Sequence, residues 1–246
     1  MDLVLGTLVL RPYVFAFLAL FLAAGAADLG WRRTLGFGAV VWPVAWLAEF
    51  SSTRIGIPFG LYHYTGVTRG RELYLANVPF MDSLSFTFLA YAALCLARAT
   101  LGRRRPSIFT LALLTGVLMM ALDLVIDPLA VRGDRWFLGR IFYYPEGGVY
   151  FGVPLSNFAG WVVVGAAGVG AYLGLAGRPT GGRVWPGVAL YHVVLGFNLA
   201  VTAWIGEWAL GAVGGAIHAA IAVTIRWVQR EAGPAPGLPN RGVQRT

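Results

Sequence analysis

The sequence has few charged residues and no lysine. Charged residues make up 12% of its 246 positions, and all 19 basic residues are arginines. A soluble domain usually has about 25% charged residues. Hydrophobic residues make up 58% of this chain, and its mean hydropathy is +0.69. The composition therefore excludes an ordinary soluble domain and indicates a polytopic membrane protein.

Cysteine and histidine are scarce, which argues against several kinds of site. The single cysteine, Cys95, lies in an apolar run, so neither an internal disulfide nor a cysteine-based metal site is expected. His192 and His218 also lie in apolar runs, without the HxxxH or ExxH spacing of metal ligands and without the histidine clusters of membrane di-iron oxygenases. Nucleotide-binding glycine motifs are missing too. We expect no metal and no cofactor, and a packing role for both histidines.

Seven apolar runs are long enough, or nearly so, to cross a membrane, which takes about 20 residues. Backbone groups in lipid must bond within their own segment, so each run is expected to be a helix. The sequence thus predicts an all-α bundle of about seven transmembrane helices over residues 1–230. The tail over 231–246 is rich in Pro and Gly and is expected to be disordered. The runs are 12–28, 34–50, 79–98, 107–126, 154–176, 184–202 and 207–226.

The arginines predict the orientation of these helices. With seven spans, twelve of the 19 arginines fall on the side that holds the C-terminus. Short cytoplasmic loops are enriched in basic residues, so the C-terminus is expected in the cytoplasm and the N-terminus outside. The same distribution explains the net charge of +8 without a nucleic-acid partner, because the arginines lie between apolar runs.

The acidic residues sort to the opposite side. Only Asp28 and Glu231 fall on the cytoplasmic side of this topology. Avoidance of the anionic cytoplasmic leaflet is one explanation, but it does not explain why so many polar residues lie inside the apolar runs. We therefore predict a polar pocket in the outer half of the bundle. Its members come from six helices: Glu49, Asp82, Asp123, Asp127, Asn157, Asn198 and Glu207.

Asp123 and Asp127 are the most suggestive pair. A spacing of four places them on one face of a helix, about one turn apart. Two neighbouring carboxyl groups in a low dielectric cannot both ionise cheaply, so one should hold a proton beside an ionised partner. This arrangement suits acid–base catalysis. The alternative is a helix-end pair, with Arg132 or Arg135 as the counter-ion of Asp127.

Glu49 precedes the stretch SSTRIGIPFGLYHYTG, which is rich in glycine, proline and aromatic residues. The stretch is typical of a re-entrant or lid-like loop over the mouth of the bundle. Tyr62 and Tyr64 are candidates to line the pocket from this loop. An aromatic belt at the membrane interface would also explain the tyrosines, and Glu49 would then be an interfacial carboxylate.

Several segments together resemble the integral-membrane carotenoid 1′,2′-hydratase family, which includes the bisanhydrobacterioruberin hydratases. The likeness covers roughly residues 45–200, and the segments around Asp123 and Gly152–Trp161 are the most specific. Polar MDSLSF at 81–86 and a long RIFYYPEGG loop at 140–148 depart from the family pattern and bear on the choice of substrate. The segments are EFSSTRIGIPFGLYHYTG, NVP at 77–79, LDLVIDP at 122–128, RW at 135–136 and YFGVPLSNFAGW at 150–161.

This resemblance implies addition of water to the terminal double bond of an acyclic ψ end group, such as that of lycopene or γ-carotene, without a redox cofactor. For this chemistry we expect Asp123 to be the first catalytic carboxylate, with Asp127 tuning or partnering it and Glu49 placing the water. Asp82 or Asn157 are other candidates to hold that water. Aromatic rings would stabilise the tertiary carbocation. The candidate rings belong to Phe59, Tyr62, Tyr64, Trp136, Tyr150, Phe158 and Trp161.

Such an enzyme would take a lipid-soluble carotenoid from the bacterial or archaeal cytoplasmic membrane and would meet other enzymes of the carotenoid pathway there. Asn198 and Glu207 would join the substrate-binding residues. Two alternatives stay open. An end-group cyclase would use the same protonation but capture the cation with an internal alkene. A lipid or carotenoid carrier would catalyse nothing, although the inverted repeats that are common in transporters are not visible.

Overall fold

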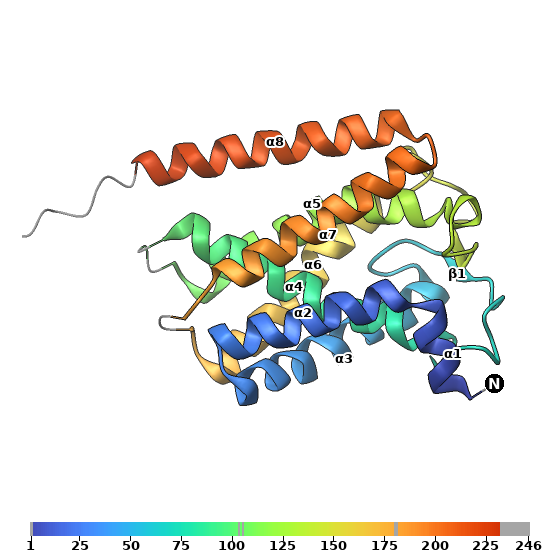
Figure 1. The fold of residues 1–246 in the computed structure, drawn as a ribbon, viewed down its shortest axis with the longest axis horizontal. Coiled ribbons are helices and arrows are strands. Elements are labelled where there is room, and N and C mark those ends of the chain that lie inside the picture. The colour runs from blue at the N-terminus through green and yellow to red at the C-terminus, as the bar shows by residue number, and fades with distance from the viewer. Residues whose placement is uncertain (1, 103, 105, 180–181, 232–246) are drawn as a thin grey trace, which may run out of the picture.

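The structure, a computed structural model, describes residues 2–102, 104, 106–179 and 182–231 (Figure 1). Most of these residues are helical. The expected tail lies outside the described residues except for Glu231, which ends the last helix. The helices are α1 (Leu3–Leu10), α2 (Pro12–Asp28), α3 (Trp31–Ile55), α4 (Phe80–Leu101), α5 (Ile108–Ala130), α6 (Leu155–Ala176), α7 (Trp185–Trp204) and α8 (Trp208–Glu231).

Six helices, α3 to α8, are long and apolar enough to cross a membrane, and the bent pair of α1 and α2 is a candidate seventh span. The prediction of an all-α membrane bundle with about seven helices is confirmed. The additional helix is α1, which meets α2 at 88°. Pro12 causes the break, because proline has no backbone N–H for the preceding turn and favours the first position of a new helix.

α4 is the central helix of the bundle and α8 is the most peripheral. In the most apolar stretch of each helix, 78% of the α4 residues but 17% of the α8 residues are buried. α8 runs along the outside of the bundle, beside α7 (Figure 1). Because its apolar face has few protein neighbours, that face lies toward lipid in a membrane.

α5 and α6 pack against each other more closely than any other pair of helices described. A Cβ atom on Gly116 of α5 would overlap the carbonyl oxygen of Val162 in α6, and a Cβ on Gly165 would lie 3.0 Å from the Gly116 Cα. Small residues at these positions let the two backbones approach, as they commonly do in membrane proteins. This approach brings the polar residues of the two helices together near the same end of the bundle.

Two long loops cover that end of the bundle. β1 (His63–Tyr64) pairs antiparallel with β4 (Phe142–Tyr143), which joins the loop after α3 to the loop after α5. β2 (Tyr74–Leu75) and β3 (Val78–Pro79) form a hairpin before α4. A short 3₁₀ helix, Gly133–Arg135, follows α5. In Figure 1 these segments lie near α1, at the end opposite the last residues of α8.

α3 extends farther than the sequence pattern predicts. The apolar run ends near residue 50, but the helix continues to Ile55 and stops at Gly56, whose φ of +75° favours glycine. Ser and Thr at 51–53 do not end it, because the side-chain oxygen of Thr53 bonds back to the Phe50 carbonyl. Glu49 therefore lies within a helix, with 5% of its surface exposed, rather than at the helix boundary.

Candidate functional site

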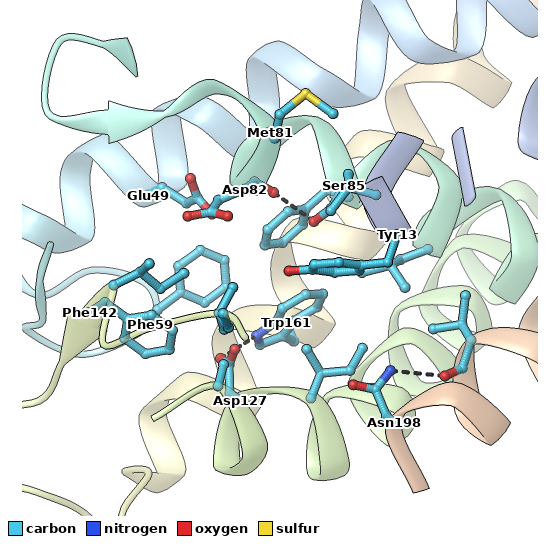
Figure 2. A pocket seen from close by; sticks show the side chains of 18 of the residues that line it. Tyr13, Glu49, Phe59, Met81, Asp82, Ser85, Asp127, Phe142, Trp161 and Asn198 are labelled. Carbon is cyan, nitrogen blue, oxygen red and sulfur yellow. Dashed lines mark hydrogen bonds between the residues drawn. The ribbon is translucent and has the colours of Figure 1, made fainter. Parts of the chain in front are cut away.

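A cavity of about 130 Å³ lies within the loop-covered end of the bundle (Figure 2). Its polar lining comes from α3, α4, α5, α6 and the two loops, whereas α2 and α7 contribute mainly apolar and aromatic side chains. Seven of the polar groups are carboxyl, amide or phenol groups that the sequence pattern had singled out. They are Glu49, Asp82, Asp127, Asn157, Asn198, Tyr62 and Tyr64.

One wall of the cavity carries the carboxyl pair of α5. Asn157 Nδ2 donates to Asp123 Oδ2 at 2.7 Å and to Asp127 Oδ2 at 2.8 Å, so a single amide bridges both acids. Asp127 lines the cavity, while Asp123 is fully buried behind it. The Oδ1 atom of Asp123 has no hydrogen-bond partner within the described residues. An arrangement of this kind can hold a proton and deliver it into the cavity.

Trp161 connects this acid pair to the aromatic lining. Its indole N–H donates to Asp127 Oδ2 at 3.2 Å, and its ring stacks on Phe86 at 4.3 Å between centroids. Phe59 lies 6.1 Å from Trp161 and 5.8 Å from Phe86, measured between ring centroids. A Cβ atom on Gly160 would overlap Phe59, so the glycine allows the loop to reach α6. The acid thus lies beside an aromatic cluster.

The counter-ion alternative for Asp127 finds no support. Arg132 and Arg135 both pair with Glu207, at the turn between α7 and α8. Within the described residues neither arginine lies within ion-pair distance of Asp123 or Asp127. Within the described residues the acid pair is therefore buried with neutral hydrogen-bond donors only. This arrangement is expensive, and it makes the pair a candidate for a functional site in a membrane protein.

Glu49 and Asp82 form the opposite wall of the cavity, facing Asp127 and Trp161 (Figure 2). The phenol of Tyr64 lies near the Glu49 carboxyl group, and both side chains line the cavity. One oxygen of each acid, Oε2 of Glu49 and Oδ2 of Asp82, is buried without a hydrogen-bond partner in the described part of the chain. Two acceptor oxygens at one end of a cavity are suited to holding a water molecule.

The tyrosines of the loop over the cavity stay protonated. Burial raises the pKa of the Tyr62 and Tyr64 phenols well above the usual value, and the nearby Glu49 carboxylate raises both further. The two rings pack edge to face at 5.4 Å, and Tyr62 also contacts Phe142 and Tyr144. Because they keep their protons, these phenols serve as hydrogen-bond donors and aromatic walls rather than as bases.

The remaining site residues predicted from the sequence divide into two groups. Trp136 and Asn198 line the cavity, and Asn198 also donates to the Val194 carbonyl at 2.9 Å. Phe158 and Glu207 do not line it. Phe158 packs on Tyr150 at 5.2 Å between ring centroids, and Glu207 is held by its two arginines.

Sequence reasoning missed several residues of the cavity because they come from segments that looked like ordinary apolar helix. Tyr13 stacks on Phe197 at 5.4 Å between centroids, which brings α2 against α7. Phe86 and Tyr144 were missed because single aromatic residues in an apolar chain carry little signal. Arg11 does not line the cavity but contacts Asp82, and it gave a clearer signal in the sequence. An arginine inside an apolar run needs a carboxylate partner.

The two helical histidines, His192 and His218, do not line this cavity. His192 is exposed on α7, and His218 is a buried neighbour of Tyr191 at 3.3 Å. Among the residues that the structure describes, no group of three or more His, Cys, Asp or Glu side chains is placed to hold a metal ion.

Comparison with known proteins gives two matches. A family model described as "Carotenoid biosynthesis protein" matches residues 2–226. Over 121 residues, 49% of this chain, the sequence is 36% identical to the bisanhydrobacterioruberin hydratase of Haloarcula japonica. That alignment covers 38% of the relative, so the chain matches well under two thirds of its length. No solved structure is significantly similar to the chain.

Proposed function

Because the chain belongs to the family of carotenoid biosynthesis proteins, we propose that it is a carotenoid 1′,2′-hydratase, a hydro-lyase of the membrane. It adds water to the terminal double bond of an acyclic ψ end group and forms a tertiary 1′-alcohol. The observation that carries the proposal is the acid pair of Asp123 and Asp127, which is buried beside an aromatic cavity and has no cation next to it among the described residues.

The first step is proton transfer to carbon. The π electrons of the C1′–C2′ bond take a proton from the Asp123/Asp127 pair and form a C–H bond at C2′, which leaves a tertiary cation at C1′. Asp127 is the member that lines the cavity. Asp123 shares Asn157 with it and makes it easier for the pair to keep one proton between them.

Aromatic faces then stabilise the cation. Trp161, Phe86 and Phe59 form a cluster beside Asp127. A desolvated cation over an aromatic face gains about 2 kcal/mol or more. Tyr62, Tyr64 and Trp136 complete an aromatic lining that keeps bulk water out. Exclusion of bulk water limits side reactions of the cation.

Water captures the cation from the other wall. Glu49, with Tyr64 beside it, offers an acceptor oxygen to orient that water. The water lone pair forms the C1′–O bond, and a proton leaves the oxygen to give the alcohol. Because the donor and the water lie on opposite walls, the proton and the hydroxyl group add to opposite faces of the double bond.

The size of the cavity suits the end of a carotenoid rather than its full length. An apolar cavity of about 150 Å³ can hold one benzene molecule, so a cavity of about 130 Å³ holds a group of roughly that size. The polyene must therefore leave the cavity. Val14 and Phe17 of α2 and Val194 and Phe197 of α7 form an apolar side of the lining, and we propose that the chain passes between these helices into lipid.

Pigment analysis in a host that makes lycopene tests the function. The expected product is heavier than the substrate by the mass of one water, about 18 Da. Asp123→Asn should lower product formation at least about 100-fold, as expected for loss of a general acid, while the protein stays in the membrane. Asp134→Asn, an exposed aspartate outside the cavity, is the matched control.

Two other outcomes would contradict the proposal. A new pigment of unchanged mass would indicate cyclisation, in which an internal alkene captures the same cation. Unaltered lycopene, with the protein present in the membrane, would exclude hydration of this end group.

The orientation of the chain is part of the proposal. We infer that the C-terminus is cytoplasmic, so that the cavity opens in the outer half of the membrane. The support is the excess of arginines near the helix ends on the side of the C-terminus. A reporter that is active only outside the cytoplasm, fused at the C-terminus, should be inactive, and an active reporter would reverse the assignment.

A further inference from the structure

Arg11 is a buried arginine at the break between α1 and α2. Only 1% of its surface is exposed, although it lies at the point where the chain turns by 88°. Arginine stays charged in proteins, so burial of its side chain requires compensating carboxylates. The structure supplies two of them, from two separate segments.

The first partner of Arg11 is Glu72, in the loop before β2. Nε and Nη2 of Arg11 donate to its two carboxylate oxygens at 2.8 and 2.9 Å, which is a bidentate pair. The Glu72 side chain is fully buried and does not line the cavity. Thr7 Oγ1 accepts a bond from the neighbouring Leu73 N–H at 2.9 Å. These contacts hold α1 on the loop.

The second partner of Arg11 is Asp82, at the start of α4. The remaining guanidinium nitrogen, Nη1, lies 3.4 Å from Asp82 Oδ1. The other oxygen of Asp82 is buried without a hydrogen-bond partner in the described part of the chain, and Asp82 lines the cavity. One oxygen of this carboxylate therefore faces a cation, and the other is free to accept a bond from a molecule in the cavity.

This arrangement separates Asp82 from the other acids of the site. Among the described residues, Glu49, Asp123 and Asp127 have no arginine within ion-pair distance, whereas Asp82 does. A neighbouring cation favours the charged form of a carboxyl group, and burial without one favours the protonated form. The Asp123/Asp127 pair and Asp82 are therefore suited to opposite tasks, because the pair can donate a proton and Asp82 can accept one.

We propose that Asp82 is the base that takes the proton from the attacking water, and that Arg11 is a positioning residue that keeps Asp82 ionised. This inference rests on the proposed hydration. When the water oxygen bonds to C1′, one of its O–H bonds breaks and the proton moves to Asp82 Oδ2, while Arg11 stays charged. The cycle closes when Asp82 returns this proton to the Asp123/Asp127 pair through water in the emptied cavity.

Deuterium uptake separates this role from that of the acid pair. Membranes containing the full-length protein are incubated with lycopene in D₂O, and both product and recovered lycopene are analysed by mass. With Asp82→Asn the cation still forms but is not captured, and it returns to an alkene by losing a proton from C2′ or an end methyl group. We expect at least about a 100-fold loss of hydration, with deuterium still entering the recovered lycopene. Asp127→Asn should lose both hydration and deuterium uptake into lycopene.

The role of the Arg11 charge is tested by comparing an uncharged variant with a charged one. Arg11→Met should lower hydration about tenfold or more while deuterium uptake into lycopene continues, and Arg11→Lys should restore part of the hydration. Arg71→Met, an exposed arginine of the same loop as Glu72, is the matched control and should behave as the parent protein. Continued deuterium uptake in Asp82→Asn and in the Arg11 variants also shows that these proteins are folded and bind lycopene.

The outcomes distinguish this inference from the proposed function. If the parent protein forms no hydrated product, the proposed function fails. If the parent protein hydrates lycopene but Asp82→Asn does too, or if Asp82→Asn loses deuterium uptake together with hydration, the base is not Asp82. A fall in hydration and uptake by the same factor in Arg11→Met, without recovery in Arg11→Lys, would make Arg11 a purely structural tie between α1 and the loop.

Discussion

The two ends of the helical bundle treat their buried acids differently. At the end away from the cavity, Asp28 of α2 has a buried side chain that meets Arg98 of α4 at 2.5 Å. Tyr91 and Cys95 of the same helix also lie at 3.4 and 3.8 Å from its Oδ2 atom. At the cavity end, Asp123 and Asp127 share the neutral side chain of Asn157 and have no arginine beside them in the described structure.

We propose that the difference separates an acid that serves the fold from acids that serve the proposed reaction. A buried carboxylate paired with arginine keeps its charge and fixes two helices, but it has no proton to give. A buried acid pair without a cation is costly to the fold, and a protein keeps such a pair where the proton is used. Asp82, with one oxygen near Arg11 and one free, lies between these two cases.

The largest effects are expected when the paired acid Asp28 and the unpaired acid Asp127 are each replaced by asparagine. Asp28→Asn leaves Arg98 without its carboxylate, which costs about 3–5 kcal/mol for a buried pair, so the protein should melt at a lower temperature in detergent. The molecules that stay folded should still hydrate lycopene. Asp127→Asn should do the reverse, with a melting temperature close to the parent's and at least about a 100-fold loss of product.

Melting curves and product yield per folded protein measure this contrast. If Asp28→Asn abolishes hydration without lowering stability, the far acid also takes part in the reaction. If Asp127→Asn unfolds the protein but folded molecules stay active, the acid pair belongs to the fold, and the comparison between the two ends fails.

A smaller effect is expected at Trp161. Its indole N–H donates a hydrogen bond to Asp127, and its ring stacks on Phe86 in the aromatic cluster. Trp161→Leu removes the aromatic face, worth about 2 kcal/mol to a buried cation, so hydration should fall about 30-fold. Trp161→Phe keeps a ring and loses only the N–H to Asp127, and its loss should be several-fold smaller. Initial rates in membranes measure both. Equal losses would show that the ring does not stabilise the cation.

Much of the fold could be predicted from the sequence because the membrane leaves few choices. An apolar run in lipid has to be a helix, and α2 begins and ends at the residues expected for the first run. The end of α3 was missed by more than one turn because Ser and Thr, although polar, can bond back to the helix and continue it. The break at Arg11 was not predicted either.

The sequence could predict at which end of the bundle the acids of the site lie, but not which acid pairs with which arginine. Alternation of the helices across the membrane brings Glu49, Asp82 and Asp127 to one end of the bundle, and all three line the cavity. Which acid meets which arginine depends on contacts between distant loops, such as that of Arg11 with Glu72, 61 positions away. No local pattern encodes these contacts, so Glu207 looked the same as the acids of the cavity.

The smallest effect is expected at Glu207. This position tests whether paired and unpaired acids also differ when both lie at the cavity end of the bundle. Glu207 lies at the same end as Asp127, but it is paired with Arg132 and Arg135, and the Arg135 side chain is 46% exposed. If pairing rather than position separates structural from reactive acids, Glu207→Gln should change hydration less than twofold. The ion pairs are partly exposed and screened, so the variant should lose no more than about 1 kcal/mol of stability.

Initial hydration rates and melting curves of Glu207→Gln, beside those of Asp127→Asn, make the comparison direct. Both changes replace a carboxylate by its amide at the same end of the bundle. Asp127 lines the cavity and has no arginine beside it in the described structure, whereas Glu207 lies outside the cavity and is paired with two arginines. A large loss of hydration in Glu207→Gln would mean that the loop of Arg132 and Arg135 must be tied to α8 for the cavity to work. Position near the cavity, and not the absence of a cation, would then be the better guide to reactive acids in this bundle.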